Sequence, residues 1–220
     1  MASPFQFTTF RDHNLEKVVD LGREMAKHLL EKKYGLTSRE LLDAIAKRFR
    51  LQAAIEGAVS EVHMERQIQR LIGDVVESYE SHDLDGQPDF SLKLPHRERP
   101  IRAETKNVRG SSAKGGSDYR LKGKAIAYKV ETQKTRTSKG DPSSRFYDIE
   151  KFEILGVCLG KKTGSWSDFL FVTTKDLTPH SSYGHKLAVF QRVPLPDADT
   201  LLPWYDDLGQ LIRDHYPAPK

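Results

Sequence analysis

The sequence contains two acids and a lysine at a spacing that suits a catalytic centre. Pro88-Asp89 is followed, after 14 residues, by Glu104-Thr105-Lys106. Side chains alternate between the two faces of a β-strand, so Glu104 and Lys106 point to the same side if this segment is extended. If Asp89 begins a neighbouring strand that pairs with it, the three side chains converge. We therefore predict a cluster of two carboxylates and one amine.

Such a cluster has the components of metal-assisted phosphodiester hydrolysis. The oxygens of Asp89 and Glu104 are the hard ligands that Mg²⁺ prefers, with the Thr105 carbonyl as a further candidate ligand and Mn²⁺ as an alternative ion. A bound Mg²⁺ polarises the phosphodiester, activates water and stabilises the leaving oxygen. Lys106 would stabilise the developing negative charge, or orient or deprotonate the attacking water. The alternative interpretation is a surface hairpin with solvated charges.

Two further acids lie on a helix expected over residues 52–72. On a helical wheel, Glu61 and Glu65 fall on the same side as the apolar residues Ala54, Ala58, Val62, Ile68 and Ile72. Carboxylates are rarely buried without a partner, so a metal site or a basic neighbour would explain this placement. The alternative is a glutamate at the edge of the apolar side that reaches solvent.

The elements that must position these residues can be predicted from hydrophobic periodicity and from turn residues. Expected helices span residues 14–33, 38–49, 52–72, 118–130 and 206–216, and expected strands span 75–79, 90–94, 101–108, 154–159, 169–172 and, more weakly, 187–193. Gly35 and Gly73 are expected to end the first and third helices, and Thr37 or Ser38 to cap the second. This order predicts an α/β fold with a central mixed sheet flanked by helices and an N-terminal helical segment.

The charge is concentrated in the middle of the chain. The net charge is +4, but residues 93–145 hold 15 Lys and Arg against 5 Asp and Glu, whereas the remainder holds 20 basic and 26 acidic residues. A basic segment on an otherwise acidic chain favours a surface that faces a polyanion, although a solvated basic face is the simpler alternative. Candidates for contacts with DNA phosphates or bases are Arg109, Lys134, Arg136, Lys139 and Arg145.

Other features exclude several classes of protein. No apolar run is long enough for a membrane-spanning helix, and no signal peptide is visible, so we expect a cytoplasmic, prokaryotic protein. The single cysteine, Cys158, cannot form an intramolecular disulfide or a cysteine-rich zinc module. The histidines do not cluster, and no Gly-rich phosphate loop indicates a need for ATP. Asp83 and Asp85 fit a turn better than a metal site.

The pattern Pro88-Asp89…Glu104-x-Lys106 resembles that of the PD-(D/E)XK nuclease superfamily. The stretch from Gly57 to Glu65 looks like the active-site helix of many type II restriction endonucleases, where a glutamate a few residues after a glycine supplies an additional acid. By that resemblance Glu61 is the first choice for a catalytic acid, and Glu65 the second. The segment that runs from Gln133 to the strand at 152–159 is also similar to restriction enzymes, so the resemblance covers roughly residues 55–172.

The resemblance implies a restriction-endonuclease-like core with a four- to five-stranded mixed sheet. It also implies a Mg²⁺-dependent type II restriction endonuclease that cleaves double-stranded DNA at a specific sequence, acting as a homodimer because two strands need two active centres. We expect one nuclease domain over residues 1–220, with a helical subregion at 1–50, a catalytic core at 52–175 and an extension at 176–220. The alternatives are a structure-selective repair nuclease or junction resolvase, and a non-catalytic DNA-binding module.

Overall fold

The computed structural model describes residues 27–84, 86–111, 113–134, 138 and 140–219. The chain divides into two compact units, residues 1–54 and 55–220, and the division falls inside helix α4 (Phe49–Gln69). Within the described residues, no helix is long and apolar enough to cross a membrane.

The described part of the first unit consists of short helices with strong local end signals. Helix α2 (Leu29–Tyr34) ends at Gly35, whose φ of 64° is left-handed, as predicted. Helix α3 (Ser38–Ala46) begins at Thr37, whose side chain accepts from the Glu40 backbone in a capping box. This confirms the expected cap. Residues 14–26 of the expected first helix lie outside the described residues.

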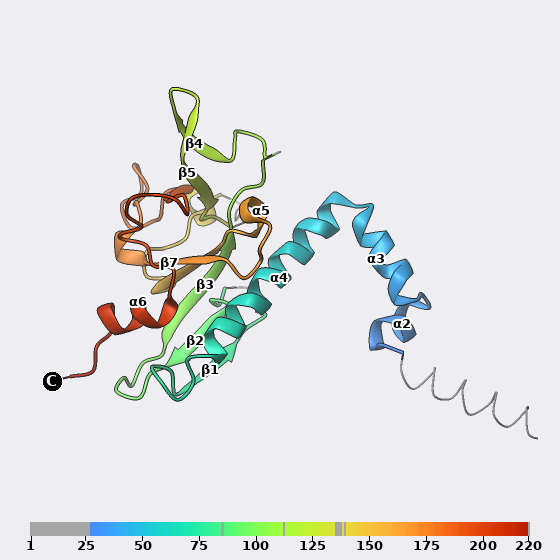
Figure 1. Ribbon diagram of the computed structural model, residues 1–220, viewed down its shortest axis with the longest axis horizontal. Helices are drawn as coiled ribbons and strands as arrows, with labels where there is room; N and C mark the ends of the chain where they lie inside the picture. Colours follow the sequence, from blue (N-terminus) through green and yellow to red (C-terminus); the bar gives the residue numbers. More distant parts are fainter. Residues whose placement is uncertain (1–26, 85, 112, 135–137, 139, 220) are drawn as a thin grey trace, which may run out of the picture. The chain divides into compact units, whose positions relative to one another are not determined.

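The second unit is built on a mixed five-stranded sheet (Figure 1). Its strands lie in the order β1 (Ser78–Ser81), β2 (Phe90–Lys93), β3 (Ile101–Asn107), β6 (Ile154–Cys158) and β7 (Phe169–Thr173). Strands β3 and β6 are parallel, and the other neighbours are antiparallel. The sheet confirms the predicted α/β class and the predicted strands, with shifts of a few residues at their ends.

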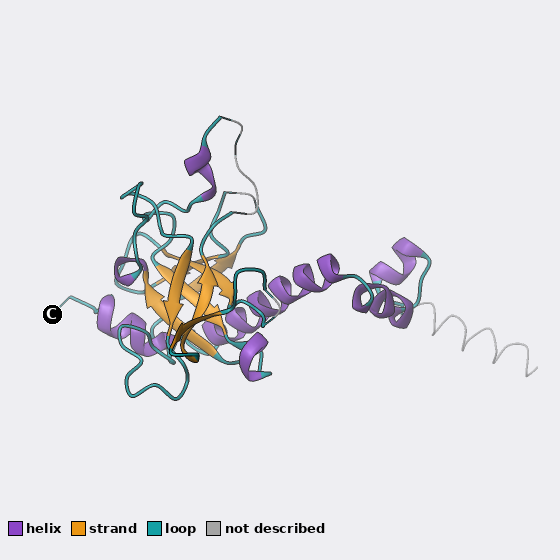
Figure 2. Ribbon diagram, turned by 90° about the horizontal axis from the view of Figure 1, so that it is seen from above, coloured by secondary structure: helices purple, strands orange, loops and turns teal. Residues whose placement is uncertain are grey.

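Two helices cover one face of this sheet. The second half of α4 and the C-terminal helix α6 (Leu208–His215) lie on the same side of the strands (Figure 2). Met64 and Ile68 of α4 share an apolar core with Leu211 and Ile212 of α6. The expected C-terminal helix is thus confirmed, and it lies beside a helix that is far away in the sequence.

The side of α4 that faces the sheet is not the one that the helical wheel predicts. Ser60, Met64 and Ile68 are buried, whereas Val62 and Ile72 are 46% and 48% exposed. Apolar residues are spread around this helix, so the wheel gives no unique face. Gly156 of β6 lets Met64 of α4 approach the sheet closely, because a Cβ added at Gly156 would lie 3.0 Å from Sδ of Met64.

A second sheet covers the opposite face. It is antiparallel, with the order β4 (Asp118–Leu121), β5 (Lys124–Glu131) and β8 (Phe190–Val193). Its Val130 and Val193 form a second core with Leu155 and Val157 of the large sheet. The weak strand expected at 187–193 is confirmed in its second half. Three short helical segments complete the unit: η1 (Pro142–Arg145), α5 (Gly160–Thr163) and η2 (Thr174–Asp176).

The helix expected over residues 118–130 is wrong, because this segment is the β4–β5 hairpin. Lys122 and Gly123 both have positive φ, 48° and 82°, which is the backbone of a two-residue hairpin turn whose twist matches that of the strands. β5 then pairs with the distant β8, a contact that no local pattern reveals.

Candidate active site

The pairing of β2 with β3 brings the predicted cluster together. Phe90 lies opposite Ala103, so Asp89, which precedes β2, reaches the level of Glu104. The backbone N–H of Thr105 donates a hydrogen bond to Oδ2 of Asp89 at 2.7 Å and fixes this carboxylate against β3. Glu104 and Lys106 lie opposite Leu155 and Val157 of β6 and share the face that carries the second core.

Glu104 is the centre of this cluster. Its side chain is almost completely buried, at 3% exposure. One oxygen, Oε1, lies 2.5 Å from Nζ of Lys106 and accepts a hydrogen bond from the Tyr147 hydroxyl at 2.9 Å. The other oxygen, Oε2, is buried and has no hydrogen-bond partner among the described residues. A buried oxygen without a partner is costly, so a cation or a hydrogen-bond donor that reaches Oε2 would be bound favourably.

The cluster holds more negative than positive charge, because two carboxylates face one ammonium group. Burial, together with the neighbouring Glu104, raises the pKa of Asp89 to about 7, although Lys106 and the Thr105 N–H oppose the shift. Burial alone would lower the pKa of Lys106, but Glu104, Tyr147 and Asp89 outweigh it and raise that pKa above its usual value. Lys106 therefore stays protonated at neutral pH, whereas Asp89 is held by its acidic neighbour near its titration point.

These residues fit a hard divalent cation. The unpaired Oε2 of Glu104 and the carboxylate of Asp89 offer oxygen ligands of the kind that Mg²⁺ takes, and Thr105 joins the two residues. Among the described residues, no three His, Cys, Asp or Glu side chains gather closely enough to hold a metal ion. The ligand set on this chain is thus the pair of carboxylates, and water and substrate oxygens would have to complete the coordination.

The two glutamates of α4 differ in their surroundings. Partial desolvation raises the pKa of Glu61, Lys106 opposes this shift, and Asp83 and Glu104 add to it, although the Glu61 side chain is exposed at the surface. Glu61 thus interacts with the cluster through its charge. Glu65 instead accepts a hydrogen bond from the Tyr79 hydroxyl at 2.8 Å. Of the two predicted alternatives, Glu61 has the electrostatic contact with Glu104 and Lys106.

The predicted DNA-contacting residues have different environments. The guanidinium of Arg109 donates to the Lys114 carbonyl and lies 4.8 Å from the centre of the Phe190 ring, so it is tied to the second sheet. The Lys134 backbone N–H donates to the Arg145 carbonyl at 2.7 Å, and Nε of Arg145 is buried without a partner among the described residues. Arg136 and Lys139, like Asp85, lie outside the described residues.

Tyr147 is a site residue that the sequence did not reveal. Besides its hydrogen bond to Glu104, its ring centre lies 5.4 Å from Nζ of Lys106. Burial raises the pKa of Tyr147 to about 12, so its hydroxyl stays protonated and donates a hydrogen bond to Glu104. Tyr147 lies far from Glu104 in the sequence, and no spacing pattern links a tyrosine to this motif.

Lys151 is a second residue that sequence patterns missed. Its ammonium donates to the Gly86 carbonyl, next to the turn that precedes Asp89. Burial lowers the pKa of Lys151, Glu104 opposes the shift, and the neighbouring Lys134 adds to it. A further cation therefore lies close to the carboxylates, on the loop that precedes β6.

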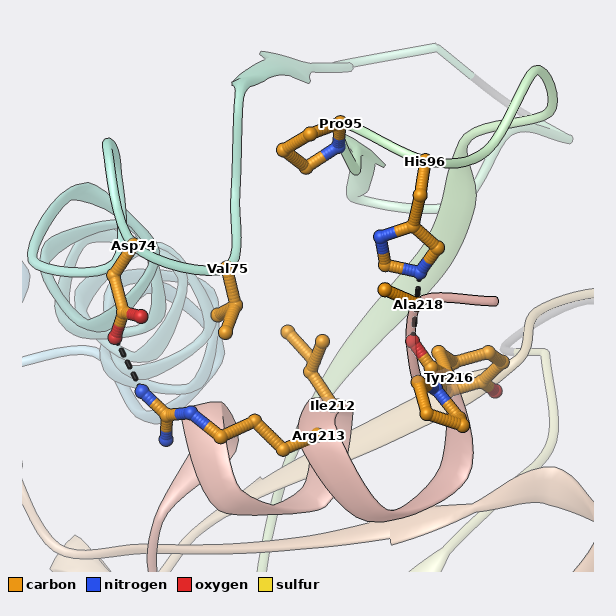
Figure 3. A pocket seen from close by; sticks show the side chains of 9 residues that line it. Asp74, Val75, Pro95, His96, Ile212, Arg213, Tyr216 and Ala218 are labelled. Atoms are coloured by element: carbon orange, nitrogen blue, oxygen red, sulfur yellow. Dashed lines mark hydrogen bonds and ion pairs between the residues drawn. The ribbon is translucent and has the colours of Figure 1, made fainter. Parts of the chain in front are cut away.

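A pocket of about 350 Å³ lies away from this cluster, between α6, the end of α4 and the β2–β3 connection (Figure 3). Its walls are closed by an ion pair between Arg213 and Asp74 and by a hydrogen bond from His96 to the Tyr216 carbonyl at 2.9 Å. It contains none of the predicted site residues, and its lining is mostly apolar. The candidate catalytic chemistry is therefore in the cluster around Glu104.

Comparisons with known proteins add little to this geometry. No family model and no curated protein sequence matches the chain. Among solved structures, a bacterial homing endonuclease aligns with a TM-score of 0.40 and 14% sequence identity, over 67% of this chain and 80% of that one. A similarity of this extent establishes neither a family nor an activity. The resemblance to the PD-(D/E)XK superfamily stays a prediction from the motif.

Proposed function

We propose that this chain is a Mg²⁺-dependent endonuclease that hydrolyses phosphodiester bonds of double-stranded DNA at a specific sequence, as type II restriction endonucleases do. The observation that supports this most is the convergence of Asp89, Glu104 and Lys106 around the unpaired Oε2 of Glu104. Two carboxylates and a protonated lysine, partly shielded from water, are the groups that metal-assisted phosphodiester hydrolysis needs.

The carboxylates of Asp89 and Glu104 would hold the ion, with the Thr105 carbonyl as a third protein ligand. When bound, Mg²⁺ supplies Lewis acidity at the phosphodiester and lowers the pKa of the attacking water. The hydrogen bond from Thr105 to Asp89 orients one carboxylate. The Tyr147 hydroxyl and Lys106 occupy Oε1 of Glu104 and so orient Oε2 of the same residue toward the site.

Lys106 acts as a cation in this proposal, not as a base. In the metal-free chain the surrounding acids raise its pKa, so it holds its proton at neutral pH. A fixed ammonium beside the scissile phosphate stabilises the extra negative charge of the pentacovalent transition state, and a preorganised group does so without reorganisation. The attacking water must then lose its proton elsewhere. We assign this step to Glu61, whose carboxylate interacts electrostatically with Lys106 and Glu104.

Cleavage of both strands requires two active centres, so we propose a homodimer as the active form. A non-catalytic DNA-binding module is a weaker alternative, because the buried Glu104 and the half-buried Asp89 repel phosphate unless a cation lies between them. A structure-selective nuclease would use the same cluster, and it differs from a restriction enzyme in the DNA that it selects.

A panel of DNA substrates separates these alternatives. Purified protein is incubated with Mg²⁺ and with phage DNA, methylated and unmethylated, or with a synthetic four-way junction, beside the Asp89→Ala variant. Discrete phage DNA fragments that are absent with Asp89→Ala would support the restriction role. Cutting at the junction alone would favour a structure-selective nuclease. DNA binding without cutting of any substrate would leave the non-catalytic module.

A further inference from the structure

The second sheet carries a basic and aromatic surface on the face turned away from the core. Directly paired residues of neighbouring strands share a face, and here Lys129 pairs with Arg192 and Glu131 pairs with Phe190. The residues between them, Val130 and Gln191, are buried on the opposite side. We call this surface the outer face; it consists of Tyr119, Lys129, Glu131, Phe190, Arg192 and the adjoining Arg109.

The cations of the outer face are held over its aromatic rings. Arg192 lies 5.0 Å from the centre of the Tyr119 ring, and Lys129 lies 5.2 Å from the same ring. Arg109 lies 4.8 Å from the centre of the Phe190 ring. Such contacts attract the cations to the ring faces and so restrict the side chains before any partner arrives. The result is a set of cations with a preformed arrangement.

Positive charge exceeds negative charge on this surface. Three cations face a single acid, Glu131, whose carboxylate lies 3.5 Å from Arg109. Arg192 is exposed and makes no ion pair or hydrogen bond with the described residues. At the hairpin tip, Lys122 and Lys124 are exposed as well and extend the same charge. A surface of this kind fits a polyanion with regularly spaced charges.

The rings indicate which form of nucleic acid fits. Proteins that bind single strands stack unpaired bases on free aromatic faces. Here the faces of Tyr119 and Phe190 are covered by Lys129, Arg192 and Arg109, so they do not offer a free stacking platform. Arg192, in contrast, is exposed and has no ion pair or hydrogen bond with the described residues, and the Lys129 ammonium is partly exposed, so both can donate to phosphates. The surface therefore matches the backbone of a duplex better than exposed bases.

The outer face is also continuous with the strand that carries the candidate active site. Val108 forms a β-bridge with Val130, and the Arg109 N–H donates to the Lys129 carbonyl at 2.9 Å. Figure 1 shows β3 leading to the base of the β4–β5 hairpin. Arg109 lies three residue steps after Lys106, roughly 10 Å at the rise of a strand. A single duplex is wide enough to touch both.

We propose that the outer face is a docking surface for the phosphate backbone of duplex DNA, through Lys129 and Arg192, with Arg109 as part of the support beneath them. This inference rests on the proposed nuclease function and adds the surface that holds the substrate. Because phosphates carry no sequence information, the outer face contributes affinity and orientation, and sequence selection belongs to other residues.

The test compares Lys129→Ala/Arg192→Ala with a control that removes the same charge, Arg99→Ala/Lys175→Ala. Arg99 and Lys175 are exposed and lie at the opposite end of the large sheet, before β3 and after β7. Binding of a fluorescein-labelled duplex to the full chain is measured by fluorescence anisotropy in Ca²⁺ buffer at several salt concentrations. We expect the outer-face variant to bind at least 10-fold more weakly and to lower the slope of log affinity against log salt by about 2. The control should match the wild type.

Two further variants test whether the charge of Arg192 itself causes the loss of affinity. Arg192→Glu reverses the charge of one exposed side chain and should bind duplex DNA more weakly than Arg192→Ala if the surface meets phosphates. Arg192→Lys keeps the charge and should retain most of the wild-type affinity. Thermal melting of each variant checks that the sheet is folded. Cleavage of plasmid DNA by the wild type is measured in parallel, so that a failure of the nuclease proposal can be told from a failure of this one.

The outcomes separate cleanly. If the wild type binds and cleaves duplex DNA but Lys129→Ala/Arg192→Ala binds with the same affinity and salt slope, the docking surface is refuted and the nuclease function stands. If the variant loses affinity for a single strand and not for the duplex, the duplex assignment is wrong. If the wild type neither binds nor cleaves any DNA, the nuclease function fails and the inference fails with it.

Discussion

At the residue scale, the chemistry depends on how Glu104 divides its two oxygens. Oε1 is held by Lys106 and by the Tyr147 hydroxyl, and Oε2 is left buried without a partner among the described residues. The arrangement is costly for the chain alone and favourable once a cation arrives. Predictions at this scale therefore concern the groups that hold Glu104, Asp89 and Glu61 in place.

Tyr147→Phe should impair the site without unfolding the protein. The variant keeps the buried ring and removes only the hydroxyl that orients Glu104. Loss of a hydrogen bond to a metal ligand typically costs about 10- to 100-fold in metal affinity or activity, and we expect that range for Mg²⁺-dependent cleavage. Tyr79→Phe is the matched control, because its hydroxyl donates to Glu65, outside the cluster. Equal activities of the two variants would remove Tyr147 from the site.

Asp89 should make the metal-free protein less stable as the pH rises. Its pKa is higher in the folded chain, about 7, than the 3.8 of an unperturbed aspartate. The folded state therefore holds a proton that the unfolded state has lost. The stability that this difference contributes is fully present below pH 3.8 and disappears as the pH rises through about 7. In EDTA we expect a lower Tm at about pH 8 than at about pH 5, and a smaller difference in Asp89→Asn. An unchanged pH dependence in the variant would contradict this assignment.

Glu61→Gln should lower the cleavage rate more than Glu65→Gln does. Glu61 interacts electrostatically with Lys106 and Glu104, whereas Glu65 is hydrogen-bonded to Tyr79. Loss of a general base typically costs about 100-fold or more, so we expect a fall of that order in kcat for Glu61→Gln. Single-turnover cleavage with saturating protein measures it. A larger loss in Glu65→Gln would exchange the roles of the two acids.

At the element scale, α4 must lie close to the large sheet for Glu61 to reach the cluster. The close approach occurs at Gly156 of β6, where a Cβ would lie 3.0 Å from Sδ of Met64 and 3.3 Å from the Phe171 ring. Ser60, one turn before Met64 on α4, is also buried. Asn107 of β3 donates to the Ser60 hydroxyl and, at 3.0 Å, to the Glu56 carbonyl. These contacts fix the height of the helix over the strand that carries Glu104.

Gly156→Ala should destabilise the protein by about 1–3 kcal/mol, since overpacking a close contact forces neighbours to shift. The comparison is Gly57→Ala on α4, where an added Cβ meets nothing within 4 Å. This second change should be neutral or stabilising by up to about 1 kcal/mol, because alanine favours a helix. Urea unfolding gives both values. A neutral Gly156→Ala would mean that α4 packs more loosely than these contacts imply.

The elements that could be predicted from the sequence are those set by local signals. The glycine at position 35 and the cap at Thr37 end and begin helices through backbone geometry within a few residues. The strand after Asp89 alternates clearly, and its antiparallel pairing with the strand of Glu104 places both acids on one side. The motif spacing then yields the cluster, because paired strands bring neighbouring positions together.

What could not be predicted depends on contacts between distant segments. Local periodicity predicts a helix where the β4–β5 hairpin lies, because β5 pairs with β8, about 60 residues away along the chain. The buried side of α4 depends on a glycine of β6, and the role of Tyr147 depends on a loop that folds back over β3. Periodicity describes one element at a time, so these features appear only in the folded chain.

At the scale of the whole molecule, the basic middle of the sequence becomes parts of two sheets that share one core. Residues 93–145 include β3 with the candidate active site, as well as β4 and β5 with the outer face. The segment thus joins a place where phosphodiesters would be cleaved to one where phosphates would be held. The homodimer that two-strand cleavage requires stays a prediction.

The most direct measurement is the conversion of supercoiled plasmid by the full-length protein with Mg²⁺ and with EDTA, for the wild type and for Asp89→Asn and Glu104→Gln. We expect nicked and then linear plasmid for the wild type with Mg²⁺ alone, and a loss of about 100- to 1,000-fold in each variant, as for removal of a charge-stabilising group. Cleavage that persists in EDTA, or equal cleavage by both variants and the wild type, would contradict a metal-dependent centre at Asp89 and Glu104.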